Sequence, residues 1–487
     1  MDWLSTTLPA MLAGGLRNLA AYLAAHVLLC LLPAFFIAGA MSALIPKESV
    51  TRFLGRNTPG AVSYPAAAAA GSLLAVCSCT IVPLFAGIYR KGAGLGPAIT
   101  FLFFAPAANI LALVYTGGVI GVDLALARFV LSLVFGIGIG LIMALLFRAD
   151  DAAHDRAAGD PFGARGGAMR PPALAFLLVW IALLLAGTLK LGVLTGSFAE
   201  FTVPWAGADR WQAALDRLVP FDAHKGEEGV TVQGALLIAL LAAIGVSAWR
   251  GLEHIHDGFS RATRLCLALI AATLLAAALA VEATPAGLRV GLTGKFVGVA
   301  LGLGVLYRLG RQRLSADELR DWLWESWRFV RQIFPLLVAG VFVVGMIRVV
   351  IRPEWIEAVA GSNTVAGNLA GVAFGVFMYF PTLVEVPIAQ MFLDLGMHRG
   401  PLLAYLMADP ELSLQSILVI AAIIGRAKTF TYVGLVALFS AVAGLAYGAW
   451  IDGAPLAVLL LSLAAFVALL VLALALTSRR SAALHGV

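Results

Sequence analysis

The feature that most constrains this chain is the separation of its charged residues from long apolar runs. Apolar stretches of about 20 residues, the length that a helix needs to cross a bilayer, alternate with short clusters of charge. Only 12% of the 487 residues are charged and 61% are hydrophobic, whereas soluble domains carry roughly 25% charged residues. The pattern predicts an all-α polytopic membrane protein with about 12 to 13 spans.

The composition of the chain excludes several classes of function. The net charge of +6 indicates loops rich in Lys and Arg on the cytoplasmic side rather than a nucleic-acid surface. Four cysteines (Cys30, Cys77, Cys79 and Cys266) are too few for a disulfide framework. The sequence contains no nucleotide-binding loop and no hydrolase motif, so we expect no cofactor and a transporter rather than an enzyme.

Glycines and prolines repeat at long range. A shift of 304 residues (387 − 83 = 304) brings Pro83 onto Pro387, and duplicated units of this kind are typical of transporter folds. The same shift gives the pairs Gly92–Gly396, Gly96–Gly400, Pro97–Pro401, Pro106–Pro410, Gly121–Gly425 and Gly140–Gly444. We therefore expect a first permease repeat (1–147), a middle insertion of about four extra spans and polar loops (148–328), a second permease repeat (329–450) and a last span with a C-terminal tail (451–487).

Each repeat carries two prolines inside apolar runs. A proline within a helix removes a backbone hydrogen bond and frees a carbonyl, which persists at membrane depth only where it is buried in protein or lines a cavity. We expect helix breaks near Cys79–Pro83 and Leu383–Pro387 that face each other at one central site; simple kinks are the alternative. The residues expected to line that site are Ser78, Thr80, Pro83, Pro106, Asn109, Thr382, Pro387 and Ser413.

Two thiols precede the first break. Cys77 and Cys79 would project about 200° apart in a regular helix, but both could contact one ligand in unwound backbone. Because thiolates select soft ions, the pair is predicted to hold a soft metalloid such as a trivalent arsenical. The alternative is that both cysteines pack as small buried residues.

The second repeat carries charge instead. Glu385, Asp409, Glu411 and Lys428 lie in or beside apolar runs, where charge is costly and usually marks a pathway, a proton relay or an ion pair. We assign these four residues to proton coupling, with Glu385 as the carrier. A structural pair of Glu385 with Lys428 or Arg426 is the alternative, as is a place near the membrane interface for Asp409 and Glu411.

Two other motifs have simpler interpretations. The segment 253–257 (Glu-His-Ile-His-Asp) is similar to a metal-binding cluster but sits in a short loop, which favours a solvated surface. The glycines at 136, 138 and 140 lie within an apolar run and predict close helix packing.

The segment 77–84 (Cys-Ser-Cys-Thr-Ile-Val-Pro-Leu), followed by Tyr-Arg-Lys-Gly at 89–92 and Gly-Pro-Ala at 96–98, resembles the signature of the ArsP-like predicted permeases of bacteria. The Gly-x-x-x-Gly-Pro and Pro410 segments of the second half fit the same family. The resemblance covers both repeats and leaves the middle spans and the last span outside. Members of this family are associated with efflux of trivalent organoarsenicals, such as methylarsenite.

Together these features lead us to expect a multi-pass permease of the bacterial inner membrane that exports a small thiophilic substrate in exchange for protons. Its partners would be that small molecule and the lipid bilayer, without nucleic acid. The alternatives are a permease for another small or lipid-like solute, and a membrane-embedded enzyme or assembly factor that uses the intramembrane acids. The sequence leaves the oligomeric state open.

Overall fold

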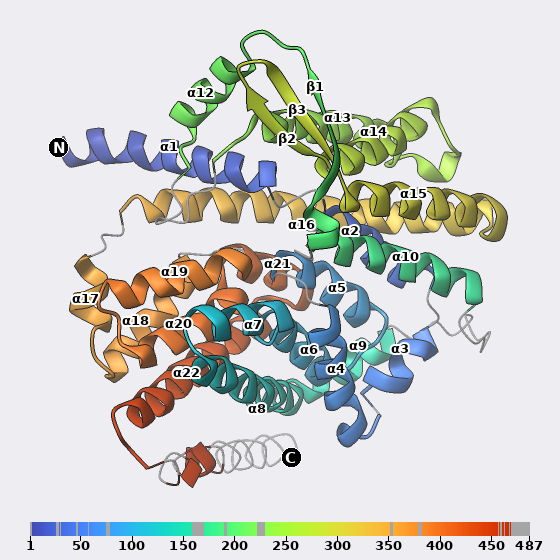
Figure 1. The fold of residues 1–487 in the computed structure, drawn as a ribbon. Coiled ribbons are helices and arrows are strands. Elements are labelled where there is room, and N and C mark those ends of the chain that lie inside the picture. The colour runs from blue at the N-terminus through green and yellow to red at the C-terminus, as the bar shows by residue number, and fades with distance from the viewer. Residues whose placement is uncertain are drawn as a thin grey trace. The chain divides into compact units, whose positions relative to one another are not determined.

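The computed structural model forms two compact units, each assembled from separate parts of the chain. Unit 1 comprises Met1–Ser49, Cys79–Lys91 and Arg165–Val349, and unit 2 comprises Val50–Ser78, Gly92–Ala164 and Val350–Val487. Helices dominate both units (Figure 1). The structure describes residues 2–468 except 26–28, 30, 45–46, 57, 75–77, 158–169, 189–191, 222–228, 351–353, 378–381, 456, 458–459, 462 and 467.

Unit 1 is built on the 33-residue helix α16 (Ala316–Arg348), which begins with a capping box between Ser315 and Glu318. Small residues let α1 and α2 approach it closely, since a Cβ added to Gly39 would lie 2.0 Å from Oγ of Ser326. The other helices of this unit are α1 (Asp2–Ala25), α2 (Leu32–Leu44), α5 (Ser78–Arg90), α10 (Pro171–Thr188), α11 (Gly192–Thr195), α12 (Ala208–Leu218), α13 (Val232–Gly251), η3 (Ile255–Asp257), α14 (Arg261–Ala277) and α15 (Gly294–Arg313).

Unit 1 also contains a three-stranded antiparallel sheet that an all-helical expectation misses. Its strands are β1 (Ser197–Val203), β2 (Ala280–Thr284) and β3 (Gly287–Thr293), with β3 in the centre (Figure 1). The β2–β3 turn depends on Gly287, whose φ of +136° is strained for other residues. The neighbouring runs are so apolar that composition favoured helix over these short strands.

Unit 2 brings helices from both halves of the chain together, with α6 and α8 in contact with α20, and α8 also in contact with α22 (Figure 1). Its helices from the first half are α3 (Lys47–Leu54, of which Val50 onward belongs to this unit), α4 (Gly60–Leu74), α6 (Leu95–Ala107), α7 (Ile110–Val119), α8 (Val122–Leu146) and α9 (Arg148–Ala157). Those from the second half are α17 (Glu354–Ala360), α18 (Val365–Phe377), α19 (Thr382–Asp394), α20 (Arg399–Leu412), α21 (Leu414–Ile424) and α22 (Arg426–Ile451).

Helix boundaries keep the 304-residue offset of the sequence. Helices α5, α6, α7 and α8 begin at residues 78, 95, 110 and 122, and α19, α20, α21 and α22 begin at 382, 399, 414 and 426. Gly92 and Gly396, which end the turns after α5 and α19, both have positive φ, at 85° and 89°. Superposition of the two sets of helices stays a prediction.

The membrane-spanning helical class is confirmed. Among the described residues, five helical stretches are long and apolar enough to cross a membrane: 95–119, α8, α13, α16 and α22. Helices α20 and α21, which meet at 46°, would form a sixth span if they count as one. The higher number of 12 to 13 spans stays a prediction, because several expected spans coincide with shorter apolar helices such as α2, α10 and α18.

The helix is continuous through the first proline of each repeat, so a break at Pro83 or Pro387 itself is wrong; the segments just before these helices, 75–77 and 378–381, lie outside the described residues, and a break there stays a prediction. Pro83 lies inside α5 and Pro387 lies inside α19, each as the sixth residue of a continuous helix. Each proline removes the one backbone hydrogen bond that its missing N–H would have donated, and the helix continues past it. The second prolines behave differently, because Pro106 and Pro410 lie one and two residues before the ends of α6 and α20.

Candidate functional site

Close glycine contacts hold the helices that frame the candidate site in unit 2. A Cβ on Gly140 of α8 would lie 2.6 Å from the carbonyl oxygen of Gly96 on α6, and a Cβ on Gly444 of α22 would lie 2.5 Å from that of Gly400 on α20. Only glycine permits such an approach of two backbones. The prediction of close packing is therefore confirmed for Gly140, whereas a Cβ on Gly138 would make only an ordinary contact of 3.6 Å with Phe439; the second half builds the same crossing at Gly444.

A fully buried ion pair joins the two halves within this frame. The guanidinium Nη2 of Arg128, on α8, lies 2.9 Å from Oε1 and 3.3 Å from Oε2 of Glu385, on α19. Both side chains have a relative exposure of 0%. Nη1 of Arg128 has no hydrogen-bond partner among the described residues, so the pair uses only one edge of the guanidinium.

Two buried hydrogen bonds occupy equivalent positions in the two halves of the chain. Nε of Arg128 donates to the carbonyl oxygen of Ala107 at 2.9 Å, where α6 ends. The hydroxyl of Tyr432 donates to Oε2 of Glu411 at 2.8 Å, where α20 ends. Positions 128 and 432 differ by 304, as do positions 107 and 411. In both halves, the long C-terminal helix therefore sends a polar side chain to the end of the proline-containing helix.

The electrostatics of this cluster are unbalanced. Glu411, on α20, is buried like Glu385, and α20 packs against α8, the helix that carries Arg128. Arg128 is the only buried arginine or lysine in the part of the chain that the structure describes. Two buried carboxyl groups thus share one buried cation, and an unpaired buried carboxylate is costly.

The other two residues assigned to proton coupling lie elsewhere. Lys428, near the start of α22, places Nζ 3.3 Å from Oδ2 of Asp150 on α9, so the alternative in which it pairs with Glu385 is wrong. Asp409 is buried on α20, but residues two apart on a helix project about 200° apart. It therefore does not share a face with Glu411, and its backbone packs against Gly375 of α18.

The predicted substrate-binding residues divide between the units. In unit 2, Asn109 and Ser413 are buried at the junctions α6–α7 and α20–α21, and Oγ of Ser413 donates to Oγ of Ser416 at 2.7 Å. Pro106 is buried there too, while Pro387 is exposed. In unit 1, Thr80 and Pro83 are buried on α5. Cys77 lies outside the described residues, as do the side chains of Ser78, Cys79 and Thr382, so the thiol site stays a prediction.

Two features of the site escaped the sequence. Arg128 was overlooked although it is the only charged residue of α8 after Asp123, and an intramembrane charge is itself a signal of function. Tyr432 carries no charge, and only its 304-residue relation to Arg128 could have singled it out.

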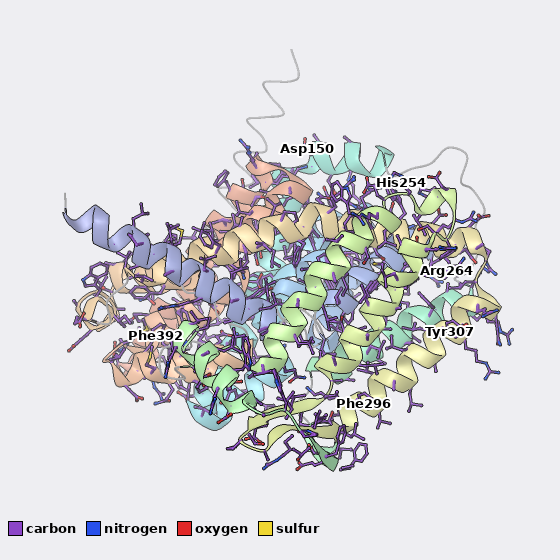
Figure 2. The ribbon with its side chains drawn as sticks, turned by 90° about the horizontal axis from the view of Figure 1, so that it is seen from above. Asp150, His254, Arg264, Phe296, Tyr307 and Phe392 are labelled. Carbon is purple, nitrogen blue, oxygen red and sulfur yellow. The ribbon has the colours of Figure 1, made fainter. Side chains whose placement is uncertain are left out.

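The motif at 253–257 is not a solvated loop throughout. Trp327 Nε1 on α16 donates to Glu253 Oε2 at 2.6 Å, and Arg331 pairs with the same carboxylate. His254, in the turn between α13 and α14, is exposed (Figure 2). No group of three or more His, Cys, Asp or Glu side chains that could hold a metal ion occurs among the described residues.

A polytopic helical protein with a buried ion pair among helices from both halves of its chain has the character of a membrane permease. The chain belongs to the predicted permease family ArsP_1, which matches residues 12–449. It is also similar to the UPF0718 protein MJ0584 of Methanocaldococcus jannaschii, with 31% identity over 423 residues, covering 87% of this chain and 92% of that protein. No solved structure matches the chain. The family match runs through 148–328, which we expected to lie outside it.

Proposed function

We propose that this permease is a secondary active transporter that exports a small thiophilic substrate, such as a trivalent organoarsenical, in exchange for protons. The single observation that carries the proposal is the buried Arg128–Glu385 pair beside Glu411. We assign the chain to transport rather than enzymatic catalysis, and to the inner membrane of a bacterium.

Proton coupling would arise from the unequal numbers of acidic and basic side chains in the buried cluster. If Glu385 and Glu411 were both ionised, the cluster would carry one uncompensated negative charge at a buried place, which is costly. Like charges that share a site do not both ionise, so the two carboxyl groups hold at least one proton between them. Such a proton can leave when the site opens to one side of the membrane and be replaced from the other.

Glu385 is the better carrier of the two, because its partner Arg128 can hold its charge once the proton has left. Glu411 has the hydroxyl of Tyr432 as its partner, which is neutral. We therefore assign proton exchange to Glu385 and a modulating role to Glu411. We assign no proton exchange to Asp409, which lies on another face of α20, or to Lys428, which pairs with Asp150.

The choice of substrate rests on Cys77 and Cys79 in the sequence and on the family. Two thiolates favour a soft metalloid over a hard ion or an organic solute. Asn109 and Ser413, both in unit 2, would offer polar contacts along the path. A single cysteine pair in one half would give the substrate one soft site rather than two.

Uptake of methylarsenite into everted membrane vesicles tests the proposal. We expect uptake that depends on a pH gradient with the vesicle interior acidic. Glu385→Gln should abolish this uptake at unchanged expression. Cys77→Ser with Cys79→Ser should abolish uptake of the arsenical at any gradient. Uptake that is independent of the pH gradient would contradict proton exchange. Uptake by the double cysteine variant would contradict substrate binding by the two thiols.

A further inference from the structure

Helices α8 and α22, which occupy equivalent places in the two halves, run antiparallel. At one end, Asp123 near the start of α8 accepts a hydrogen bond of 2.7 Å from Tyr447 near the end of α22. At the other end, Lys428 near the start of α22 pairs with Asp150, just beyond the end of α8. At both places, the start of one helix therefore lies beside the end of the other.

The middle of this helix pair carries the equivalence further. The rings of Phe135 and Phe439 pack edge to face with centroids 4.8 Å apart. These residues are 304 apart (439 − 135 = 304), so equivalent side chains of the two halves touch each other. When residue i meets its own equivalent, the two copies are related by a two-fold axis through that contact.

We infer that the two halves form an inverted repeat whose pseudo-two-fold axis passes between Phe135 and Phe439 in the plane of the membrane. Helix α8 has 25 residues, about 37 Å of length, which is enough to cross the bilayer. An antiparallel equivalent of a membrane-crossing helix enters from the opposite face. Equivalent loops of the two halves then lie on opposite sides of the membrane.

The inverted arrangement puts a different ion-pair cluster at each face. At the first face, Arg399 Nη1 donates to Oδ2 of Asp123 at 2.7 Å, and Tyr447 donates to the same oxygen. At the second face, Lys428 Nζ lies 3.3 Å from Oδ2 of Asp150, near the start of α9 (Figure 2). We call these the Asp123 cluster and the Lys428 pair.

Both ion pairs lie just outside the buried site. Arg128 follows Asp123 by five residues on α8, about 7.5 Å along the axis, and Tyr432 follows Lys428 by four residues on α22, about 6 Å. The side chains of Asp123, Arg399 and Asp150 are 32%, 34% and 58% exposed, in contrast to the buried site. The Asp123 cluster and the Lys428 pair are therefore gates that close the site on opposite faces and open in alternation. This gating role rests on the proposed transport function, whereas the inverted topology does not.

Topology can be tested without any substrate. Gly118 and Ala422 are equivalent exposed positions in the last turns of α7 and α21 (422 − 118 = 304). In a chain whose native cysteines are replaced by serine, Gly118→Cys and Ala422→Cys should react with a membrane-impermeant maleimide from opposite sides of the membrane. Labelling of both from the same side would overturn the inverted repeat. Epitope tags inserted at the same positions of the unaltered chain give the same readout if the serine background fails to fold.

Accessibility of a buried position tests the gates. With Ser413→Cys as reporter at the α20–α21 junction, Asp123→Asn should raise the labelling rate at least tenfold from one face, and Lys428→Gln should raise it from the other. Arg426→Gln, an exposed neighbour of Lys428 on α22, serves as the control. Equal effects of both gate variants from one face, or no effect of either, would overturn the gates. Correct topology and gating without arsenical transport would instead reject only the proposed function.

Discussion

Nη2 of Arg128 lies 2.9 Å from Oε1 of Glu385, and neither side chain is exposed. Removing one partner of a buried pair leaves an uncompensated charge, which costs about 3–5 kcal/mol, whereas removing both can be nearly neutral. We therefore expect that replacing both residues of the pair harms stability less than replacing one of them.

We expect Arg128→Met to lower the free energy of unfolding in detergent by about 3–5 kcal/mol. Adding Glu385→Gln to that variant should restore most of the loss, because no buried charge then lacks a partner. Unfolding by denaturant, followed by tryptophan fluorescence, measures both. Arg426→Met, at an exposed position, controls for loss of a positive charge. Losses that simply add in the double variant would contradict the buried pair.

Removal of the Tyr432 hydroxyl should leave Oε2 of Glu411 without its donor. A buried acceptor deprived of its partner costs about 1–3 kcal/mol, so Tyr432→Phe should reduce stability by that amount. The matched control is Tyr307→Phe, since Tyr307 is 67% exposed and accepts a hydrogen bond from the surface residue Arg311. The idea fails if thermal unfolding of the two variants shows no difference.

Two glycines of α22 should respond oppositely to alanine. Gly444→Ala places a Cβ 2.5 Å from the carbonyl of Gly400 and should cost about 1–3 kcal/mol by overpacking. Gly434→Ala meets nothing within 4 Å and should be neutral or stabilise the helix by up to about 1 kcal/mol. Thermal midpoints in detergent compare them directly, and equal losses would argue against the close α20–α22 crossing.

Glu253 should make the stability of unit 1 depend on pH. The hydrogen bond from Trp327, aided by Arg331, holds the pKa of this carboxyl below its ordinary value of 4.5. Since the folded pKa is the lower one, the contact stabilises fully above 4.5 and is lost as the pH falls through the folded pKa. Glu253→Gln should therefore lower the thermal midpoint at pH 7, with the difference from the unaltered protein shrinking towards pH 3. Glu282→Gln, whose side chain is 70% exposed, should show no such trend.

The membrane class and the offset of 304 residues were readable because both depend on local composition and on glycines and prolines, which act on their own backbone. The partner of Glu385 was not readable. Lys428 and Arg426 were the partners named in the alternative of a structural pair, but a pair is decided by which helices pack together, and α8 reaches α19 over 257 residues of chain. The strands β2 and β3 were missed for a related reason, since their pairing is a contact between segments and not a property of either.

The proline predictions show the limit of a local rule. Pro83 and Pro387 lie inside continuous helices, whereas Pro106 and Pro410 lie within two residues of a helix end. Sequence gives the position of a proline but not that of the helix end. The same residue type thus lies in a helix interior at one place and near a terminus at another.

Arg128 and Tyr432 occupy equivalent positions, yet one is a permanent cation and the other a neutral phenol. In the inverted repeat that we infer, these two positions would frame the site from opposite sides with unlike chemistry. A carrier with identical halves would have two facing states of equal energy and would equilibrate its cargo. Because a cation stands at one position and a phenol at the other, we expect the two facing states of this permease to differ in energy, so that one predominates before any gradient is applied.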